Sequence, residues 1–174
     1  MVRPLASLRS PPSAFLEPWF SQIGVVSVLI SGCFRANSAS GVAVNDECML
    51  KFGELQSKRL HRFITFKMDD KFKEIIVDKV GEREANYDEF IATLPENDCR
   101  YAIYDFDFVT AEDVQKSRIF YILWSPQSSK VKSKMLYASS NQKFKSGLNG
   151  IQVEMQATDI SDIDIAEIKE RAQR

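Results

Sequence analysis

The stretch Leu94-Pro-Glu-Asn-Asp-Cys-Arg-Tyr-Ala-Ile-Tyr-Asp-Phe-Asp107 contains most of the clearest strand pattern in the chain. From Arg100 to Val109, alanine and aromatic side chains alternate with Ile103 and two aspartates, so the two groups would occupy opposite faces of an extended segment. Further along, Ile119-Phe-Tyr-Ile-Leu-Trp124 is apolar without alternation, which is typical of a strand buried on both faces. A sheet with such a strand must be covered by helices on each side. The sequence therefore predicts an α/β fold.

Other segments from residue 45 onward also show helical or extended patterns. A helix is predicted from Asn45 to Lys58-Arg59, because Asn45 can cap it and apolar residues recur at Cys48, Phe52 and Leu55. The other predicted elements are strands over 62–68, 73–80 and 152–157, helices over 87–94 and 164–171, and a long helix that Ser128 or Ser129 caps and that ends near 148.

The first 35 residues differ in kind from the rest. They contain prolines at positions 4, 11, 12 and 18, three arginines and a single acid, Glu17. We predict that residues 1–35 are an N-terminal extension and that residues 36–174 form one folded domain. The apolar run over 23–30 is too short to span a bilayer, which takes about 20 residues. A disordered segment, a targeting peptide and a spurious upstream extension of the reading frame all fit this composition.

Composition and spacing exclude several classes of protein. A net charge of -1 and the absence of a zinc-finger or RNP-like motif argue against nucleic-acid binding. The three cysteines lack disulfide or metal spacing, and the single histidine leaves Cys99 with only His61 as a possible base. Asp105 and Asp107 share a strand face, but no phosphate loop or second acid cluster completes a site. We expect no enzyme, cofactor or metal.

The 94–107 segment resembles the signature of the actin-depolymerising factor/cofilin family. Segments 125–126, 131–140 and 150–159 match the family in the same order, and the resemblance covers about residue 36 to the end, with 108–112 similar to the plant branch. It implies a mixed sheet of about five strands flanked by helices on both faces. It also implies a monomeric protein that binds monomeric and filamentous actin, prefers the ADP form, and severs and depolymerises filaments. A filament-bundling or side-stabilising member of the family is the alternative.

The long helix carries the strongest indication of a binding surface. Lys130, Lys132 and Lys134 crowd its first turns, where the helix dipole disfavours cations by roughly 0.3–1 kcal/mol each. Taken alone, such a cluster fits a solvated lysine face as well as a binding surface. The resemblance maps Lys132 and Lys134 onto actin-binding positions and thereby favours binding. The actin-binding residues predicted in this way are Lys132, Lys134, Met135, Lys116, Arg118, Glu170, Arg171, Arg174, Ser40 and Gly41.

Three further expectations concern regulation and helix stability. Ser40 matches the family's regulatory phosphorylation serine, where a kinase would add a charge of about -1.5 to -2. The cluster Lys58, Arg59 and Arg62 could serve nuclear import, bind phosphoinositides or be a solvated junction, so the expected location is the cytoplasm and actin cytoskeleton, with the nucleus as an alternative. Gly147 costs about 1 kcal/mol of helix propensity, so we expect the end of the long helix to fray.

Overall fold

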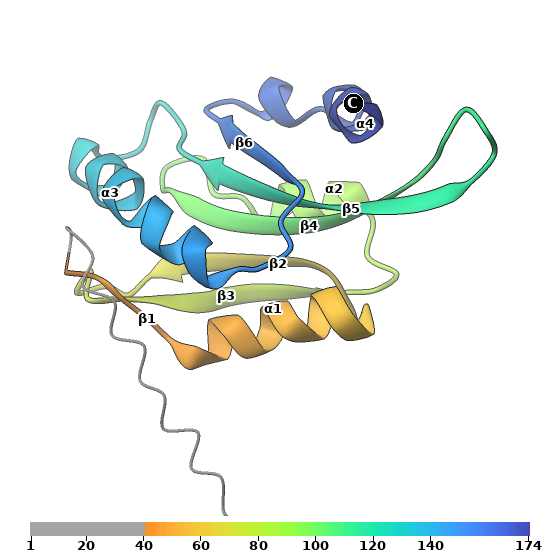
Figure 1. Ribbon diagram of the computed structural model, residues 1–174. Coiled ribbons are helices and arrows are strands. Elements are labelled where there is room, and N and C mark those ends of the chain that lie inside the picture. The colour runs from red at the N-terminus through yellow and green to blue at the C-terminus, as the bar shows by residue number, and fades with distance from the viewer. Residues whose placement is uncertain (1–40) are drawn as a thin grey trace, which may run out of the picture. The chain divides into compact units, whose positions relative to one another are not determined.

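A computed structural model of the chain describes residues 41–174, so the predictions for residues 1–35 and for Ser40 lie outside the described part. Within it, a six-stranded mixed sheet has the order β1-β3-β2-β4-β5-β6 (Figure 1). The strands are β1 (Ala43–Val44), β2 (His61–Met68), β3 (Glu74–Glu82), β4 (Arg100–Val109), β5 (Gln115–Trp124) and β6 (Val153–Ala157). The helices are α1 (Asp46–Lys58), α2 (Tyr87–Ala92), α3 (Val131–Gly147), the 3-10 helix η1 (Ile160–Ile163) and α4 (Ile165–Gln173).

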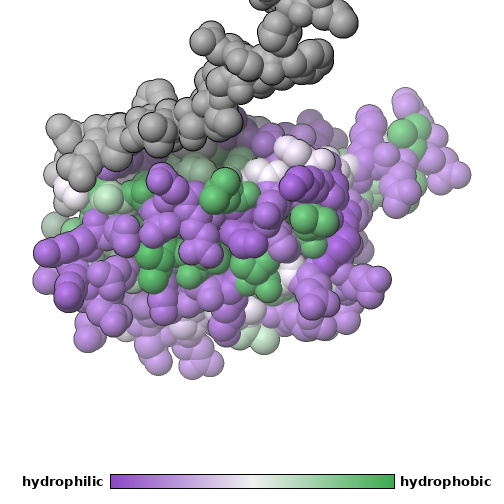
Figure 2. All heavy atoms as spheres, turned by 90° about the horizontal axis from the view of Figure 1, so that it is seen from below, coloured by the Kyte–Doolittle hydropathy of each residue, from purple (hydrophilic) through white to green (hydrophobic). Residues whose placement is uncertain are grey.

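Two hydrophobic cores cover the two faces of this sheet and confirm the α/β prediction. On one face, buried side chains of α1 and α3, such as Leu55 and Phe144, pack with alternate residues of the central strands. On the other face, α2 and α4 contribute Phe90 and Ile168 to a second core. The side of the domain that carries α1 is mostly polar, with small separate apolar patches (Figure 2). Both faces of the sheet are thus closed by helices.

Apart from shifts of one or two residues at the ends of elements, three features differ from the predictions. The two-residue strand β1 was not predicted, because so short a segment has no periodicity. β5 begins at Gln115 rather than at Ile119, because its first four residues are polar and pair with β4 without burying apolar side chains. The prediction that Ser128 or Ser129 caps α3 was wrong. Lys130 is the cap residue, and the Ser129 hydroxyl donates to the Pro126 carbonyl at 2.7 Å.

Gly147 has a packing role that could not be predicted from its low helix propensity. The helix extends through Gly147, so the expected fraying is not seen before that residue. A Cβ atom at this position would lie 2.8 Å from the Met49 Cε atom of α1. The glycine therefore lets the end of α3 lie close to α1.

β4 and β5 continue beyond the rest of the sheet as a two-stranded ribbon. β4 pairs with β2 only through residues 101–104, whereas its pairing with β5 runs on to Val109 and Gln115. β5 in turn pairs with β6 only from Phe120 onward. We call residues 105–119 the arm, which projects to one side of the domain (Figure 1).

Candidate functional site

The beginning of α3 exposes apolar and basic side chains together. Val131 and Met135 are 72% and 67% exposed, and their spacing of four residues places them on one face of the helix. Lys130 and Lys132 are also exposed beside them. Exposed apolar groups rimmed by charge mark interaction sites. We call Lys130, Val131, Lys132, Lys134 and Met135 the α3 surface. Sequence reasoning missed Val131, although its position one turn before Met135 was visible.

Two of these lysines have defined contacts. The Lys132 ammonium lies 5.5 Å from the centroid of the Phe72 ring, a cation–π contact with the loop between β2 and β3. The Lys134 ammonium donates to the Gln127 carbonyl at 3.1 Å. The first turn of α3 contains no acidic residue. The positive charges therefore add to the positive end of the helix dipole and make this surface suited to an acidic partner.

The described chain begins next to the same helix. Gly41 is exposed and has a φ of 69°, a left-handed conformation that glycine adopts without steric cost. Val42 is buried, and its carbonyl accepts a hydrogen bond from the Lys143 ammonium of α3 at 2.6 Å. β1 then pairs with β3. The structure thus places Gly41 and Val42 beside α3, and a contribution of Ser40 and Gly41 to actin binding stays a prediction.

The other predicted basic pair lies on the arm. Lys116 and Arg118 of β5 stand opposite Phe108 and Phe106 of β4, so their side chains share the face of the sheet that α4 covers. The Arg118 guanidinium carbon lies 5.9 Å from the centroid of the Phe108 ring. Lys116 is exposed. These two cations form the arm surface.

The predicted residues of α4 lie on this same face of the sheet. Arg171 donates to Glu167 at 2.7 Å, and Arg174 pairs with Glu170, both at a spacing of one helical turn. Pairs of this kind on an open helix surface are weak and rearrange easily. A partner that approaches α4 can therefore compete for these charges.

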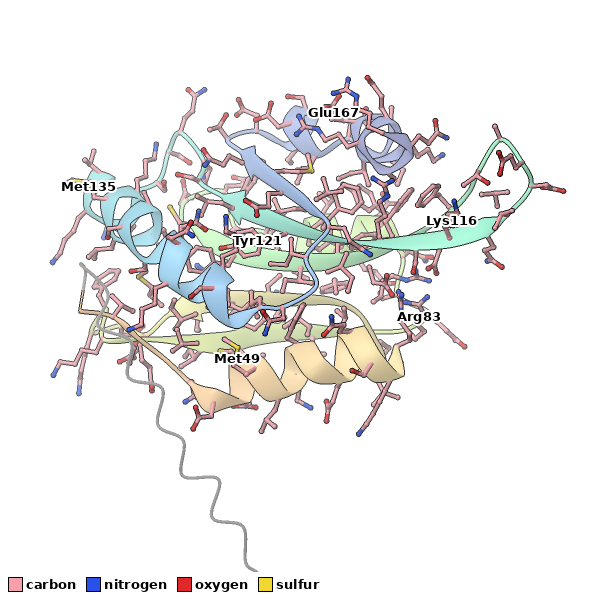
Figure 3. The ribbon with its side chains drawn as sticks, viewed as in Figure 1. Met49, Arg83, Lys116, Tyr121, Met135 and Glu167 are labelled. Atoms are coloured by element: carbon pink, nitrogen blue, oxygen red, sulfur yellow. The ribbon has the colours of Figure 1, made fainter. Side chains whose placement is uncertain are left out.

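The structure separates the predicted residues into two distant groups. Met135 lies at one end of the domain and Lys116 lies at the other (Figure 3). Lys132, Lys134 and Met135 are brought together, as sequence spacing indicated. Lys116 and Arg118 are not part of that surface. A partner that contacts both groups must span the width of the domain.

The basic cluster at the end of α1 is largely committed to internal ion pairs. Arg59 binds Asp105, and Arg62 binds Asp107 at 2.7 Å. Lys58 is exposed. Arg59 and Arg62 are thus held in ion pairs, although the Arg59 side chain stays 40% exposed. Nuclear import or phosphoinositide binding stays a prediction that rests mainly on Lys58.

The groups considered for catalysis do not meet. The Cys99 thiol is buried with its Sγ atom 3.4 Å from the Ser129 Oγ atom, while His61 binds Glu54 at 3.1 Å. Hydrogen bonds from Lys51 and then His61 hold the pKa of Glu54 below its usual range. Within residues 41–174 no cluster of histidine, cysteine and acidic residues could hold a metal ion. No helix in this part of the chain is long and apolar enough to cross a membrane.

Acid is expected to weaken the domain by protonating Asp107. Burial alone would raise the pKa of this carboxyl group, but a hydrogen bond from Arg62 and the charges of Arg83 and Arg62 outweigh burial and hold the pKa below its usual range. A carboxylate whose pKa is lower in the folded state contributes stability above its unfolded pKa of about 3.9. That contribution is lost as the pH falls through the folded pKa.

Urea unfolding of the wild-type protein and of Asp107→Asn at about pH 7 and about pH 3 checks this expectation. The difference in unfolding free energy between the two proteins should shrink at the lower pH, because protonation of Asp107 begins to remove the contribution that Asp107→Asn lacks at both pH values. A difference that stays constant between the two pH values would contradict the expected role of Asp107.

Comparison with known proteins agrees with this geometry. A family model described as cofilin/tropomyosin-type actin-binding protein matches residues 41–173. Actin-depolymerizing factor 3 of Zea mays is 85% identical over 137 residues, which cover 79% of this chain and 99% of that relative. Actin-depolymerizing factor 4 of Oryza sativa subsp. japonica is 68% identical over 136 residues, 78% of this chain and 98% of the relative. A crystal structure of Streptomyces griseoflavus cofilin aligns with a TM-score of 0.71 and 35% identity over 76% of this chain and 97% of that one.

The chain therefore belongs to the actin-depolymerising factor/cofilin family of actin-binding proteins, which are not classical enzymes. Within that family it falls in the plant branch, as the Zea mays and Oryza relatives show. The resemblance seen in residues 94–107 is thereby confirmed.

Proposed function

We propose that this protein binds monomeric and filamentous actin, prefers the ADP-bound form, and severs and depolymerises filaments. The observation that carries the proposal is the presence of two positively charged surfaces at opposite ends of one domain (Figure 3). The relatives named actin-depolymerizing factors support the same activity.

The α3 surface binds one actin subunit, in monomers as well as filaments, and the arm surface binds a second subunit in filaments only. The α3 surface offers exposed Val131 and Met135 with lysines around them, which suits a single actin subunit. The arm surface lies too far away to share that contact, so it meets a second subunit, which only a filament provides. A protein that contacts two subunits binds best to filaments whose twist suits both contacts, and it draws the filament toward that state.

Regulation and location follow from the same surfaces. Phosphorylation of Ser40 would place negative charge within two residues of Val42, which α3 holds through Lys143, and would repel an acidic partner. We propose a protein kinase acting at Ser40 and phosphoinositides acting at the basic residues as regulators. The proposed form is a monomer in the cytoplasm on the actin cytoskeleton, with the nucleus as a second location.

The proposal is tested by microscopy of labelled ADP-actin filaments with the full chain and with a version that starts at Ala36. Severing and shortening by both forms is the expected result. Severing by the shorter form alone would show that residues 1–35 mask the site. If neither form binds filaments, the proposed function is wrong.

Low-speed and high-speed sedimentation of the same samples separates the bundling alternative from severing. Bundles sediment at low speed, whereas severed filaments leave actin in the supernatant. Residues 1–35 carry three arginines against one acid, so they could supply a second filament contact. Bundling that disappears in the shorter form would favour this alternative.

A further inference from the structure

Five charged side chains meet where the arm leaves the sheet. They come from the end of α1, from β2, from the loop after β3, and from β4, and they are Arg59, Arg62, Arg83, Asp105 and Asp107. We call this group the clamp. Arginines and aspartates alternate along it, so that each aspartate binds two arginines and Arg83 bridges both aspartates. Figure 3 shows Arg83 at the side of the domain from which the arm projects.

The contacts of the clamp are short and involve the backbone as well. Arg83 donates to Asp105 at 2.5 Å and to Asp107 at 2.6 Å. Arg62 donates to Asp107 at 2.7 Å and to the backbone carbonyls of Arg83 and Asp105, each at 3.1 Å. Planar guanidinium groups with several donors fix both distance and direction. The clamp therefore ties the loop after β3 to the first residues of the arm.

The burial of Asp105 indicates a role beyond stability. Its side chain is fully buried, while Arg59 and Arg83 remain 40% and 33% exposed. Taking a carboxylate out of water has a large cost that ion pairs repay only in part, and apolar residues of similar size often stabilise a site as well. A buried ionic group of this kind is better explained by the geometry that it imposes.

The arm needs such a constraint. A ribbon of two strands is marginally stable without further support. On its α4 face the arm is supported by Phe106 and Phe108, which pack into the second core. On the opposite face Asp105 and Asp107 project toward the α1 side, and the clamp is the support there. The first clamp residue of β4, Asp105, directly follows Tyr104, which is the last residue of β4 that pairs with β2.

The clamp also adjoins the strand segment that carries Lys116. A shallow depression of about 340 Å³ is lined by Arg59, Arg83 and Asp107 of the clamp, and by Gln115, Lys116 and Ser117 of the arm. A change in the clamp would therefore move the strand that carries Lys116.

We propose that the clamp is a positioning device that fixes the arm in the orientation needed for filament contact. The inference rests on the proposed function and deepens it, because it concerns the second contact, which monomeric actin lacks. The clamp residues act through Lys116 and Arg118 and need not touch actin themselves. Loosening the clamp should weaken filament binding and leave monomer binding at the α3 surface unchanged.

Arg83→Gln tests this, because it removes the bridge while Asp105 keeps Arg59 and Asp107 keeps Arg62. Arg100→Gln is the matched control. Arg100 is the first residue of β4 and lies at the end of that strand away from the arm. It also binds two aspartates, Asp78 and Asp98. Both variants lose one partly buried, doubly paired arginine, so a general loss of stability would appear in both.

Three measurements are made on the full-length chain. Hydrogen exchange of residues 105–119 should become about 10-fold faster in Arg83→Gln and stay unchanged in Arg100→Gln. Filament affinity by co-sedimentation should fall about 5- to 10-fold in Arg83→Gln alone, while monomer affinity changes less than about 2-fold. Lys116→Ala should cost less filament affinity in the Arg83→Gln background than in the wild type, because the lysine is already misplaced.

Each outcome decides the matter. Unchanged exchange in the arm of Arg83→Gln, or faster exchange with full filament affinity, would overturn the positioning role. An equal loss of monomer and filament binding would assign the clamp to general stability and overturn it as well. Failure of the wild-type protein to bind filaments would instead refute the proposed function, and the exchange data would still show whether the clamp holds the arm.

Discussion

Replacing Phe144 with alanine is expected to lower the free energy of unfolding by about 3–5 kcal/mol. Phe144 of α3 is fully buried. Its ring centroid lies 5.0 Å from that of Phe66, 4.8 Å from that of Tyr101 and 6.3 Å from that of Tyr121. These partners come from β2, β4 and β5, so three strands would have to shift together to fill the space. The cavity would stay open, and its cost would be added to the lost burial of the ring.

Urea unfolding followed by circular dichroism measures this loss. Met135→Ala is the control, since it removes a large side chain from the same helix at a position that is 67% exposed. The control should change the unfolding free energy by less than about 0.5 kcal/mol. A loss below about 1 kcal/mol in Phe144→Ala would mean that α3 contributes little to the core, contrary to the packing described above.

The sequence predicted those parts of the fold that local periodicity determines. The alternation from Arg100 to Val109 assigned each side chain of β4 to the correct face, because a strand repeats every two residues. β1 and the first four residues of β5 lack such a pattern, so local periodicity did not assign them to strands. Their residues are held by pairing with Glu74, Ile75 and the end of β4, and pairing between distant segments leaves no periodic pattern.

The same distinction separates the two parts of the candidate site. The lysines of the α3 surface are neighbours along one helix, so their spacing in the sequence was enough to predict that they lie together. The clamp joins Arg59 to Asp105 across 46 positions and Arg83 to Asp105 across 22, and only the order of strands brings these residues together. Asp105 and Asp107 were considered as a pair of catalytic acids, and the structure shows them instead as partners of arginine.

The double substitution Lys132→Ala/Lys134→Ala is expected to weaken binding to both monomeric and filamentous actin by about 10- to 100-fold, or about 1.4–2.8 kcal/mol. Both lysines flank exposed Met135 on the α3 surface, the contact that monomers and filaments share in the proposed function. Titration of labelled actin monomers and co-sedimentation with filaments measure the two affinities. The shared loss distinguishes this surface from the arm, where filament binding alone should suffer.

Stability should hardly change, because two effects oppose each other. Removing cations from the positive end of α3 relieves roughly 0.3–1 kcal/mol per lysine. Against this, the lost contact of Lys132 with Phe72 costs about 0.5–1 kcal/mol at an exposed site, and Lys134 loses its hydrogen bond to the Gln127 carbonyl. Lys58→Ala/Lys79→Ala is the matched control, since it removes the same charge from exposed positions on α1 and β3. Equal losses of affinity in the two double variants would mean that Lys132 and Lys134 act only through the general attraction between opposite charges. A loss confined to Lys132→Ala/Lys134→Ala, at unchanged stability, would show that these two cations are retained for binding at the expense of the helix that carries them.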